Sequence, residues 1–272
     1  MENIKDKIIV GIASYNEEGV IEDVIMSALQ ISNEIILIDN NSIDDTIKIA
    51  KKYQEVKVVT HSINQTEYKD RIKLIINNVS DKNKHILHLN CSERIDESLV
   101  NKLSLVDFDS YDAISVYRKA LTDGYPTHPY HLLYLIRSIL GRHKTYRIVR
   151  GSEWSEKKCR IHGEWQPKSN QRKKRFNLPV TYSGIKVYRD GDISLNERKH
   201  ITYSECDAAS YVRCSNINTL MRLIYLPILY FISNVPYLIF SYSTQRLISV
   251  VQHCYYLVSV QLRILKSSVV KK

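Results

Sequence analysis

A chain of 272 residues is long enough to bury one complete α/β core and a smaller appended element, but not two large independent domains. Charged residues make up 25% of the chain and hydrophobic residues 44%, which excludes wholesale disorder and a protein with many membrane spans. The formal net charge of +10 makes a polyanion a natural partner, without choosing among nucleic acid, anionic lipid and phosphorylated substrates.

The first hundred residues alternate between strand and helix patterns. The expected strands are short apolar runs at 8–12, 34–39, 56–60 and 85–89, and the expected helices, with apolar residues at helical spacing, are 18–31, 47–53 and 68–79. Short connections between them predict a mostly parallel sheet with helices on both faces. Ligands of such sheets collect at the carboxyl ends of the strands, where Tyr15, Asp39 and Asn90 fall.

Beyond residue 100 the pattern becomes irregular and basic. Between Arg142 and Arg175, twelve Lys or Arg stand against three Glu. This composition suits an acceptor-binding half built on the same sheet, and a solvated basic face is the alternative.

The composition changes again near residue 218. The segment 220–240 is almost wholly apolar or aromatic, and 241–265 continues amphipathically. Arg222 and two prolines interrupt the apolar run, so a helical pair lying against a bilayer surface fits better than a membrane span. A tail that packs on the domain is the alternative. We therefore expect a domain over 1–215, divided into halves 1–97 and 98–215, and an amphipathic helical extension over 216–272.

Two further features indicate the compartment. The five cysteines are scattered, odd in number and without a Cys-x-x-Cys pair, so they predict neither a zinc nor a redox site and favour a reducing compartment. The N-terminus has mixed charge and leads into the apolar run at 8–12, so it lacks the regions of a signal peptide. We expect a cytoplasmic protein.

Asp39 is the first candidate for chemistry. It ends a buried strand, where an ionised carboxylate is unfavourable unless it caps a turn or meets a ligand. An Asx-turn that accepts backbone N–H groups accounts for Asp39 alone as well as a ligand does.

Two segments read together are more specific. Residues 9–18 (IVGIASYNEE) and 34–46 (EIILIDNNSIDDT) closely resemble family 2 glycosyltransferases, particularly the branch that extends lipopolysaccharide cores and other surface glycans. The resemblance implies a GT-A type nucleotide-sugar fold, and an Arg like that in 68–71 (YKDR) lies by the diphosphate in that family. The donor residues that it implies, with neighbours that we add, are Ser14, Tyr15, Glu17, Asp39, Asn41, Arg71 and Asn90.

The chain departs from this family at the end of the fourth strand. The family pattern there is Asp-x-Asp followed by Glu, which holds Mn²⁺ or Mg²⁺, but residues 89–96 read LNCSERID. Both aspartates are missing, so a metal would rely on Glu93, with Asp96 as a further candidate. Three explanations remain open: metal binding through Glu93, metal-free catalysis in which Arg and Lys neutralise the diphosphate, and loss of transfer activity.

Later segments resemble the family more loosely. Residues 147–150 (RIVR), 160–164 (RIHGE) and 200–203 (HITY) echo its motifs. Inverting transfer needs a general base on the acceptor hydroxyl, and Glu164 is the candidate, with His162 placing the acceptor or phosphate. A histidine at an unmatched position, such as His200, is more often structural than catalytic.

The resemblance thus implies an inverting, hexosyltransferase-type enzyme that moves a sugar from a nucleotide donor, with a UDP-sugar as first candidate, to a surface glycan or glycolipid such as lipopolysaccharide or capsule. We expect it on the inner face of the cell membrane, against anionic lipid. A non-catalytic glycosyltransferase-like nucleotide-binding subunit is the alternative. A nucleic-acid partner is disfavoured, because the basic run lacks a recognisable binding module.

Overall fold

The structure is a computed structural model. It describes residues 3–62, 68–116, 118–122, 125–126, 146–154, 175–178, 185–188, 216–240 and 244–269. The chain divides into two compact units. The first consists of Met1–Lys119 and Tyr134–Tyr188, and the second of Ala120–Leu133 and Arg189–Lys272. The predicted domain limits at 97 and 215 stay predictions.

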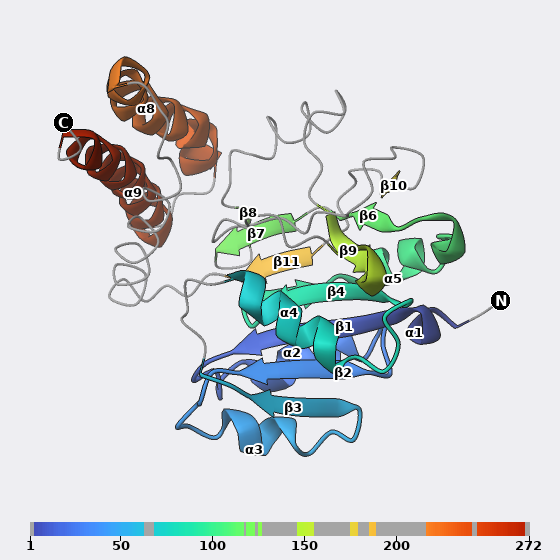
Figure 1. The fold of residues 1–272 in the computed structure, drawn as a ribbon. Helices are drawn as coiled ribbons and strands as arrows, with labels where there is room; N and C mark the ends of the chain where they lie inside the picture. The colour runs from blue at the N-terminus through green and yellow to red at the C-terminus, as the bar shows by residue number, and fades with distance from the viewer. Residues whose placement is uncertain are drawn as a thin grey trace. The chain divides into compact units, whose positions relative to one another are not determined.

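The first unit is built on a seven-stranded sheet with the strand order β10-β6-β9-β4-β1-β2-β3 (Figure 1). Its strands are β1 (Ile8–Ser14), β2 (Ile35–Asp39), β3 (Val56–Thr60), β4 (His85–Asn90), β6 (Ala113–Ser115), β9 (Tyr146–Arg150) and β10 (Arg175–Asn177). β1 pairs in parallel with β2 and β4, and β2 pairs in parallel with β3. Only β9 runs against its neighbours β4 and β6, so this sheet is mostly parallel, as predicted.

Helices accompany the sheet on both faces. They are α1 (Ile4–Lys7), α2 (Ile21–Ala28), α3 (Thr46–Ala50), α4 (Tyr68–Asn78) and α5 (Glu97–Leu103), with single 3₁₀ turns at Phe108–Ser110 and Gly151–Glu153. The four predicted strands and three predicted helices of residues 8–90 are confirmed in type and order. The helices are shorter than predicted; α2, for example, begins at Ile21 because residues 18–20 form a turn.

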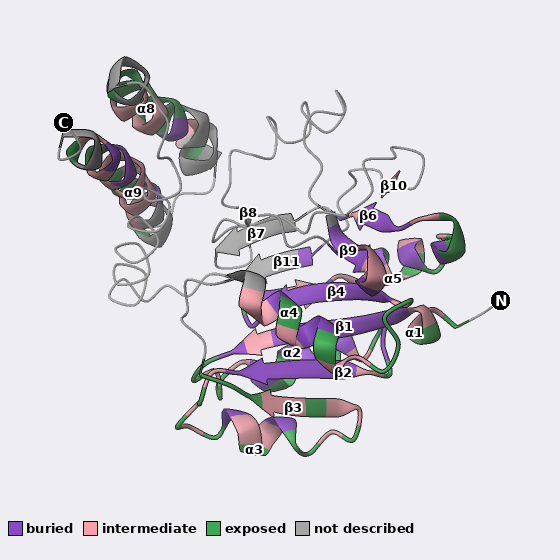
Figure 2. Ribbon diagram, in the orientation of Figure 1, coloured by how far each residue is buried: buried purple, intermediate pink, exposed green. Residues whose placement is uncertain are grey.

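The alternation of side chains along the strands explains their continuous apolar runs. In β1, Ile8, Val10 and Ile12 belong to a core cluster that includes α2 and α5, whereas Ile9 belongs to a second cluster with α4. Successive strand side chains point to opposite faces, and helices cover both, so the side chains of β1 and β2 are apolar on both faces until the strands end at Ser14 and Asp39. Figure 2 shows β1, β2 and β4 as the buried centre of the unit.

Two shorter pairings complete the described strands. β5 (Glu93–Ile95) follows the fourth strand closely and pairs antiparallel with β11 (Ile185–Tyr188). β7 (Arg118–Thr122) pairs antiparallel with β8 (Tyr125–Pro126).

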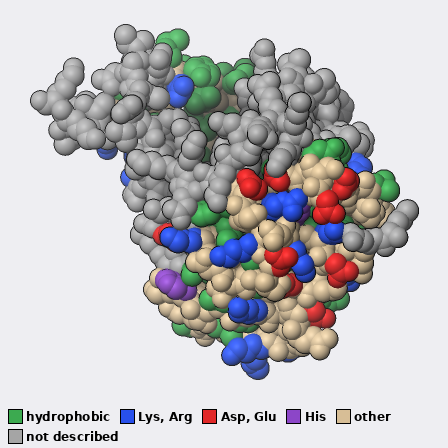
Figure 3. Space-filling model, turned by 45° about the vertical axis from the view of Figure 1, so that its right-hand side comes forward, with side chains coloured by type: hydrophobic (Ala, Val, Ile, Leu, Met, Phe, Trp, Pro, Cys, Tyr) green, Lys and Arg blue, Asp and Glu red, His purple; other side chains and the backbone are tan. Residues whose placement is uncertain are grey.

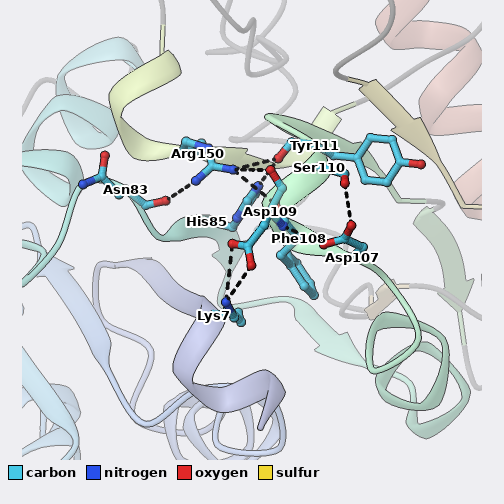
Figure 4. A network of polar contacts seen from close by, with 9 residues as sticks. All are labelled: Lys7, Asn83, His85, Asp107, Phe108, Asp109, Ser110, Tyr111 and Arg150. Atoms are coloured by element: carbon cyan, nitrogen blue, oxygen red, sulfur yellow. Dashed lines mark hydrogen bonds and ion pairs between the residues drawn. The ribbon is translucent and has the colours of Figure 1, made fainter. Parts of the chain in front are cut away.

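Arg150 organises the amino edge of β1 and β4, opposite the predicted site (Figure 4). Its guanidinium pairs with Asp112 at 3.3 Å and donates to the carbonyls of Asn83 and Tyr111. His85 also bonds the Tyr111 carbonyl, at 2.7 Å. Burial lowers the pKa of His85 to about 4, so the ring is neutral near pH 7 and its Nε2–H donates this bond.

The second unit contains two long helices, α8 (Asn216–Phe240) and α9 (Thr244–Val269), which pack against each other. The rings of Tyr230 and His253 lie 4.3 Å apart, and the Cys254 thiol contacts the Pro227 carbonyl at 3.5 Å. α8 continues through Pro227 and Pro236, although each proline removes a backbone donor and its ring crowds the preceding turn of the helix. Among the described helices, none combines the length and apolar character that crossing a bilayer requires.

Gly11 is where the sheet and α4 come closest. A Cβ atom at this position would lie 2.6 Å from Cδ1 and 2.7 Å from Cγ2 of the buried Ile75, whereas a Cβ at the exposed Gly19 would meet nothing within 4 Å. We predict that Gly11→Ala lowers the free energy of unfolding by about 1–3 kcal/mol through overpacking. Gly19→Ala changes it by less than about 1 kcal/mol. Urea unfolding measures both, and equal effects of the two substitutions would contradict the packing.

Candidate functional site

The candidate site lies at the carboxyl edge of β1, β2 and β4. The register pairs Ser14 with Asp39 and Ala13 with Asn90, so the three predicted positions that follow these strands do come together in the fold. The loops after β1 and β2 each contain an Asn with a left-handed backbone, Asn16 at φ 53° and Asn41 at φ 58°. Asn is among the few residues other than Gly that adopt this conformation readily, because its short side chain bonds locally.

Asp39 is the centre of these loops, and it has no exposed surface. One carboxylate oxygen accepts from the Ser14 hydroxyl at 2.8 Å and from the Ser42 hydroxyl at 2.6 Å. The other accepts from the backbone N–H of Ser42 at 2.7 Å. The sequence left two roles open for Asp39, capping a turn or meeting a ligand, and the structure shows the turn. These three donors stabilise a carboxylate that burial alone would disfavour.

Asn16 and Ser42 join the two loops to each other. The Ser42 hydroxyl accepts from the backbone N–H of Asn16 at 2.8 Å, and the Asn16 side chain accepts from the backbone N–H of Ile43 at 2.9 Å. Ser42 thus receives a bond from one loop while it donates to Asp39. The loops are held as one unit by groups within them.

A second set of bonds closes the loops further along. The Thr46 hydroxyl accepts from the backbone N–H of Glu17 at 2.8 Å. Asp44 accepts from the Glu18 backbone N–H at 3.0 Å, and the Glu18 carboxylate accepts in return from the Asp45 backbone N–H at 3.0 Å. Partial burial raises the pKa of Asp44, but the hydrogen bonds from Thr46 and from backbone N–H groups outweigh it and hold that pKa below its usual value. Asp44 is therefore an ionised acceptor at neutral pH.

The remaining donor candidates lie around these loops. Tyr15 is 45% exposed, and Asn41 is exposed beside the buried Asp39. Glu17 and Arg71 are half-buried. Arg71 lies in the first turn of α4, one turn before the Ile75 that contacts Gly11, which brings it toward the carboxyl end of β1.

Asn90 begins a tight turn that Glu93 closes. The Glu93 carboxylate has no exposed surface and accepts from the Asn90 backbone N–H at 2.9 Å. The same oxygen forms an ion pair of 2.5 Å with Arg147 on β9, and that guanidinium also donates to the His88 carbonyl at 2.7 Å. Glu93 therefore points into the protein, toward Arg147.

Arg94 and Cys91 hold the same turn from its other sides. The Arg94 guanidinium donates to the carbonyls of Cys91 at 2.7 Å and Glu93 at 2.9 Å, and reaches the Val20 carbonyl before α2 at 3.0 Å. The Cys91 thiol donates to the Ala13 carbonyl at 3.2 Å. Burial, with nearby carboxylates, raises the pKa of this thiol, so it is protonated and unreactive at neutral pH.

The side chains of this turn do not fit the divalent ion that the family implies. A hard cation prefers several carboxylate oxygens at one point. Here the carboxylate of Glu93 is buried against Arg147, and Asn90 and Ser92 offer only neutral oxygens. Within the described ranges, moreover, no three His, Cys, Asp or Glu side chains are grouped so as to hold a metal ion.

Several predicted residues lie outside the described residues. These are Glu164 and His162, together with the segments 160–164 and 200–203 and most of the basic stretch. Of the segment 147–150, both arginines are described, and each forms an ion pair with a carboxylate, Arg147 with Glu93 and Arg150 with Asp112. The arginines therefore anchor β9 at its two ends.

A polar pocket of about 340 Å³ opens at the opposite, amino edge of the sheet. Lys7, His85 and Arg150 line it, and it includes none of the predicted donor residues. The candidate site is therefore defined by the loops at the carboxyl edge and not by this pocket.

Comparison with known proteins agrees with the geometry at the carboxyl edge. Residues 9–87 match the family model of glycosyl transferase family 2. This matched segment begins in β1 and ends in β4, so it contains both cross-linked loops. None of the curated proteins compared with the sequence matches it.

Solved structures establish the fold. A mannosyltransferase from Pyrobaculum calidifontis, solved in complex with GDP-Man and Mn²⁺, is 9% identical and superposes with a TM-score of 0.54 over 95% of this chain and 87% of its own. S. aureus TarS 1-349 is 15% identical, with a TM-score of 0.48 over 98% and 92% of the two chains. The superposition on the mannosyltransferase gives the fold as the GT-A type, and an identity this low establishes no more than the fold.

Ser42 tests the connection between the loops. Ser42→Ala removes a donor to Asp39 and an acceptor for Asn16, so we predict a loss of about 1–3 kcal/mol in the free energy of unfolding. The control is Ser104→Ala, whose exposed hydroxyl donates to the Asn101 carbonyl, with an expected change within about 0.5 kcal/mol. Chemical denaturation measures both, and an unaffected Ser42→Ala protein would refute the role given to this hydroxyl.

Proposed function

We propose that this chain is a glycosyltransferase that binds a nucleotide-sugar donor at the carboxyl edge of β1, β2 and β4. The single observation that carries the proposal is the pair of loops after β1 and β2, locked around the buried Asp39, within the segment that matches the glycosyl transferase family 2 model. The GT-A type fold supports it, because ligands of such sheets bind at this edge.

In this proposal the loops provide a rigid surface for the nucleoside. Tyr15 projects from it with almost half its surface exposed and stacks on the base. Asn41 and Glu17 offer polar groups for the base and ribose. Asp39 acts mainly by positioning the loops, because its oxygens already accept three hydrogen bonds, one from Ser14 at the end of β1 and two from Ser42. Arg71, at the start of α4, balances the charge of the diphosphate.

The proposed reaction is transfer with inversion. An oxygen of the acceptor hydroxyl forms a bond to the anomeric carbon, the bond from that carbon to the diphosphate breaks, and the nucleoside diphosphate leaves with the electron pair. The acceptor proton passes to a general base, for which the sequence proposes Glu164, with His162 placing the acceptor. Both residues are carried over from the family resemblance. The acceptor class, a surface glycan or glycolipid, rests on the same resemblance.

The helices of the second unit support contact with a membrane surface. Exposed apolar side chains recur on α8 at positions 220, 224, 228 and 232, one helical turn apart, with 221, 225 and 229 beside them. Neither α8 nor α9 contains Asp or Glu, and the two helices carry Arg222, Arg246, Arg263 and Lys266. An apolar stripe on a helix pair whose charged residues are all basic suits an anionic bilayer surface. We therefore propose a peripheral position on the inner face of the cell membrane.

Nucleic acid is not among the proposed partners. On the face shown in Figure 3, Lys and Arg side chains are interleaved with Asp and Glu over the described part of the first unit. A polynucleotide favours a continuous basic surface, whereas charges of both signs offer it as much repulsion as attraction.

Nucleotide binding tests the proposed donor site. We expect UDP or GDP to bind the full chain in isothermal titration calorimetry, and Tyr15→Ala to weaken binding roughly tenfold through loss of stacking. The matched control is Tyr255→Ala, an exposed tyrosine on α9, which leaves the affinity unchanged. If neither nucleotide binds the wild-type protein at millimolar concentration, the proposed function is wrong.

Turnover separates the enzyme from a non-catalytic subunit. A glycosyltransferase slowly hydrolyses or transfers the sugar of a donor that it binds, whereas a non-catalytic subunit binds the nucleotide and leaves the donor intact. Mass spectrometry of UDP-glucose, UDP-N-acetylglucosamine and GDP-mannose after incubation with the protein distinguishes the enzyme from the non-catalytic subunit.

The apolar stripe of α8 is tested by flotation with lipid vesicles. We predict that the protein floats with vesicles containing phosphatidylglycerol, and that the double variant Ile228→Asp, Ile232→Asp reduces the bound fraction at least about fivefold, because aspartates oppose both apolar burial and the anionic surface. The control carries the same kind of change on the first unit, Met26→Asp with Leu105→Asp, both exposed there. Equal loss in both double variants, or no wild-type binding, would contradict the membrane role.

A further inference from the structure

The turn from Asn90 to Glu93 occupies the place in the fold where the family pattern puts its metal-binding carboxylates. Three groups of the turn that would otherwise attract a cation are bonded within the protein. The Glu93 carboxylate bonds Arg147 and the Asn90 backbone, and the carbonyls of Cys91 and Glu93 itself accept from Arg94. The Cys91 thiol donates to the Ala13 carbonyl and is therefore protonated.

Charge leads to the same conclusion. The guanidinium of Arg147 is 6% exposed and neutralises the only carboxylate within the turn. Arg94 brings a second positive charge against the turn's backbone and lies 3.6 Å from Asp23 on α2. A divalent cation would have to displace Arg147 from Glu93 or bind beside two guanidinium groups with only neutral oxygens from Asn90 and Ser92, and both arrangements are unfavourable.

We propose that this turn is held by Arg94 and Arg147 in place of a divalent ion, and that nucleotide binding at the carboxyl edge is independent of metal. Glu93 is then a positioning residue: its carboxylate fixes the turn that presents Asn90 and Ser92 to the ligand. The proposal rests on the proposed function for the identity of the ligand. The absence of a metal site in the turn does not depend on that function, and it is tested on the protein without nucleotide.

The first experiment measures Mn²⁺ binding directly. Electron paramagnetic resonance of the full chain titrated with Mn²⁺, without nucleotide, is expected to show no stoichiometric site tighter than about 1 mM. The double variant Asn90→Asp, Ser92→Asp introduces two carboxylates into the turn, at the half-buried Asn90 and the exposed Ser92, and we expect at least tenfold tighter Mn²⁺ binding in it. Stoichiometric Mn²⁺ binding by the wild-type protein would overturn the proposal, as would the absence of any gain in the double variant.

The second experiment measures UDP and GDP affinity in EDTA and in Mn²⁺. Metal independence predicts that the wild-type dissociation constant differs less than about threefold between the two conditions, and that Mn²⁺ tightens binding by the double variant at least tenfold. A tenfold gain from Mn²⁺ in the wild-type protein would refute the inference. If no nucleotide binds in either condition, the proposed function fails, whereas the Mn²⁺ titration still decides the inference.

A third comparison assigns the role of Glu93. Because Glu93 is the partner of Arg147, we expect Glu93→Gln and Arg147→Met each to lower the melting temperature by roughly 10 °C. The double variant lowers it no further than either single change, because the two side chains act as one pair. The control is Glu97→Gln, the same change at an exposed position of α5. If Glu93 positions the turn, the conservative change Glu93→Asp retains part of the nucleotide affinity that Glu93→Gln loses. Additive losses from the two single changes would overturn the pairing.

Discussion

The carboxylate of Asp39 lies at the end of β2 without exposed surface, and its three hydrogen-bond donors come from Ser14 at the end of β1 and from Ser42 in the loop after β2. An ionised group in this position is stable only while those donors stay in place. The requirement fixes the backbone of both loops, because Ser42 serves Asp39 and Asn16 at the same time. The surface that carries Tyr15 is rigid for this reason, and a rigid surface loses little conformational entropy on binding the nucleoside that we propose for it.

The turn after β4 repeats this arrangement with a different residue. Glu93 is buried as fully as Asp39, and Arg147 and the Asn90 backbone hold it in place. In both positions an acidic residue at the edge of the sheet shapes the backbone from within, and neutral or aromatic groups face outward. A carboxylate used in this way cannot also serve a cation in solvent, since the two roles need opposite orientations of the side chain.

Much of this architecture was predictable from the sequence. The apolar run of β1 predicted a strand with both faces covered, and the two core clusters confirm it. The position of Asp39 at the end of such a run predicted that it would cap a turn or meet a ligand, and the turn is observed. The density of Asn, Ser, Thr and Asp in 40–46 is a signal of local side-chain bonding that could also have indicated Thr46 and Asp44 as members of the network.

The pairing of Glu93 with Arg147 was not predictable in the same way. The two residues are 54 positions apart, and they meet because β9 enters the sheet antiparallel to β4. Nothing local distinguishes a glutamate that faces an arginine inside the protein from one that faces solvent. The same holds for Arg150. It belongs to the segment 147–150 that echoes a family motif, but it lies at the amino edge of β4, opposite the candidate site.

The sequence by itself determined the order of strands and helices over residues 8–90 and the edge of the sheet at which polar residues collect. These depend on hydrophobic periodicity and local backbone preference, which neighbouring residues settle among themselves. Only the tertiary structure decided which carboxylates are buried and with what charge they pair. That outcome depends on contacts between distant strands, and burial of a charge is a property of the assembled fold rather than of the residue.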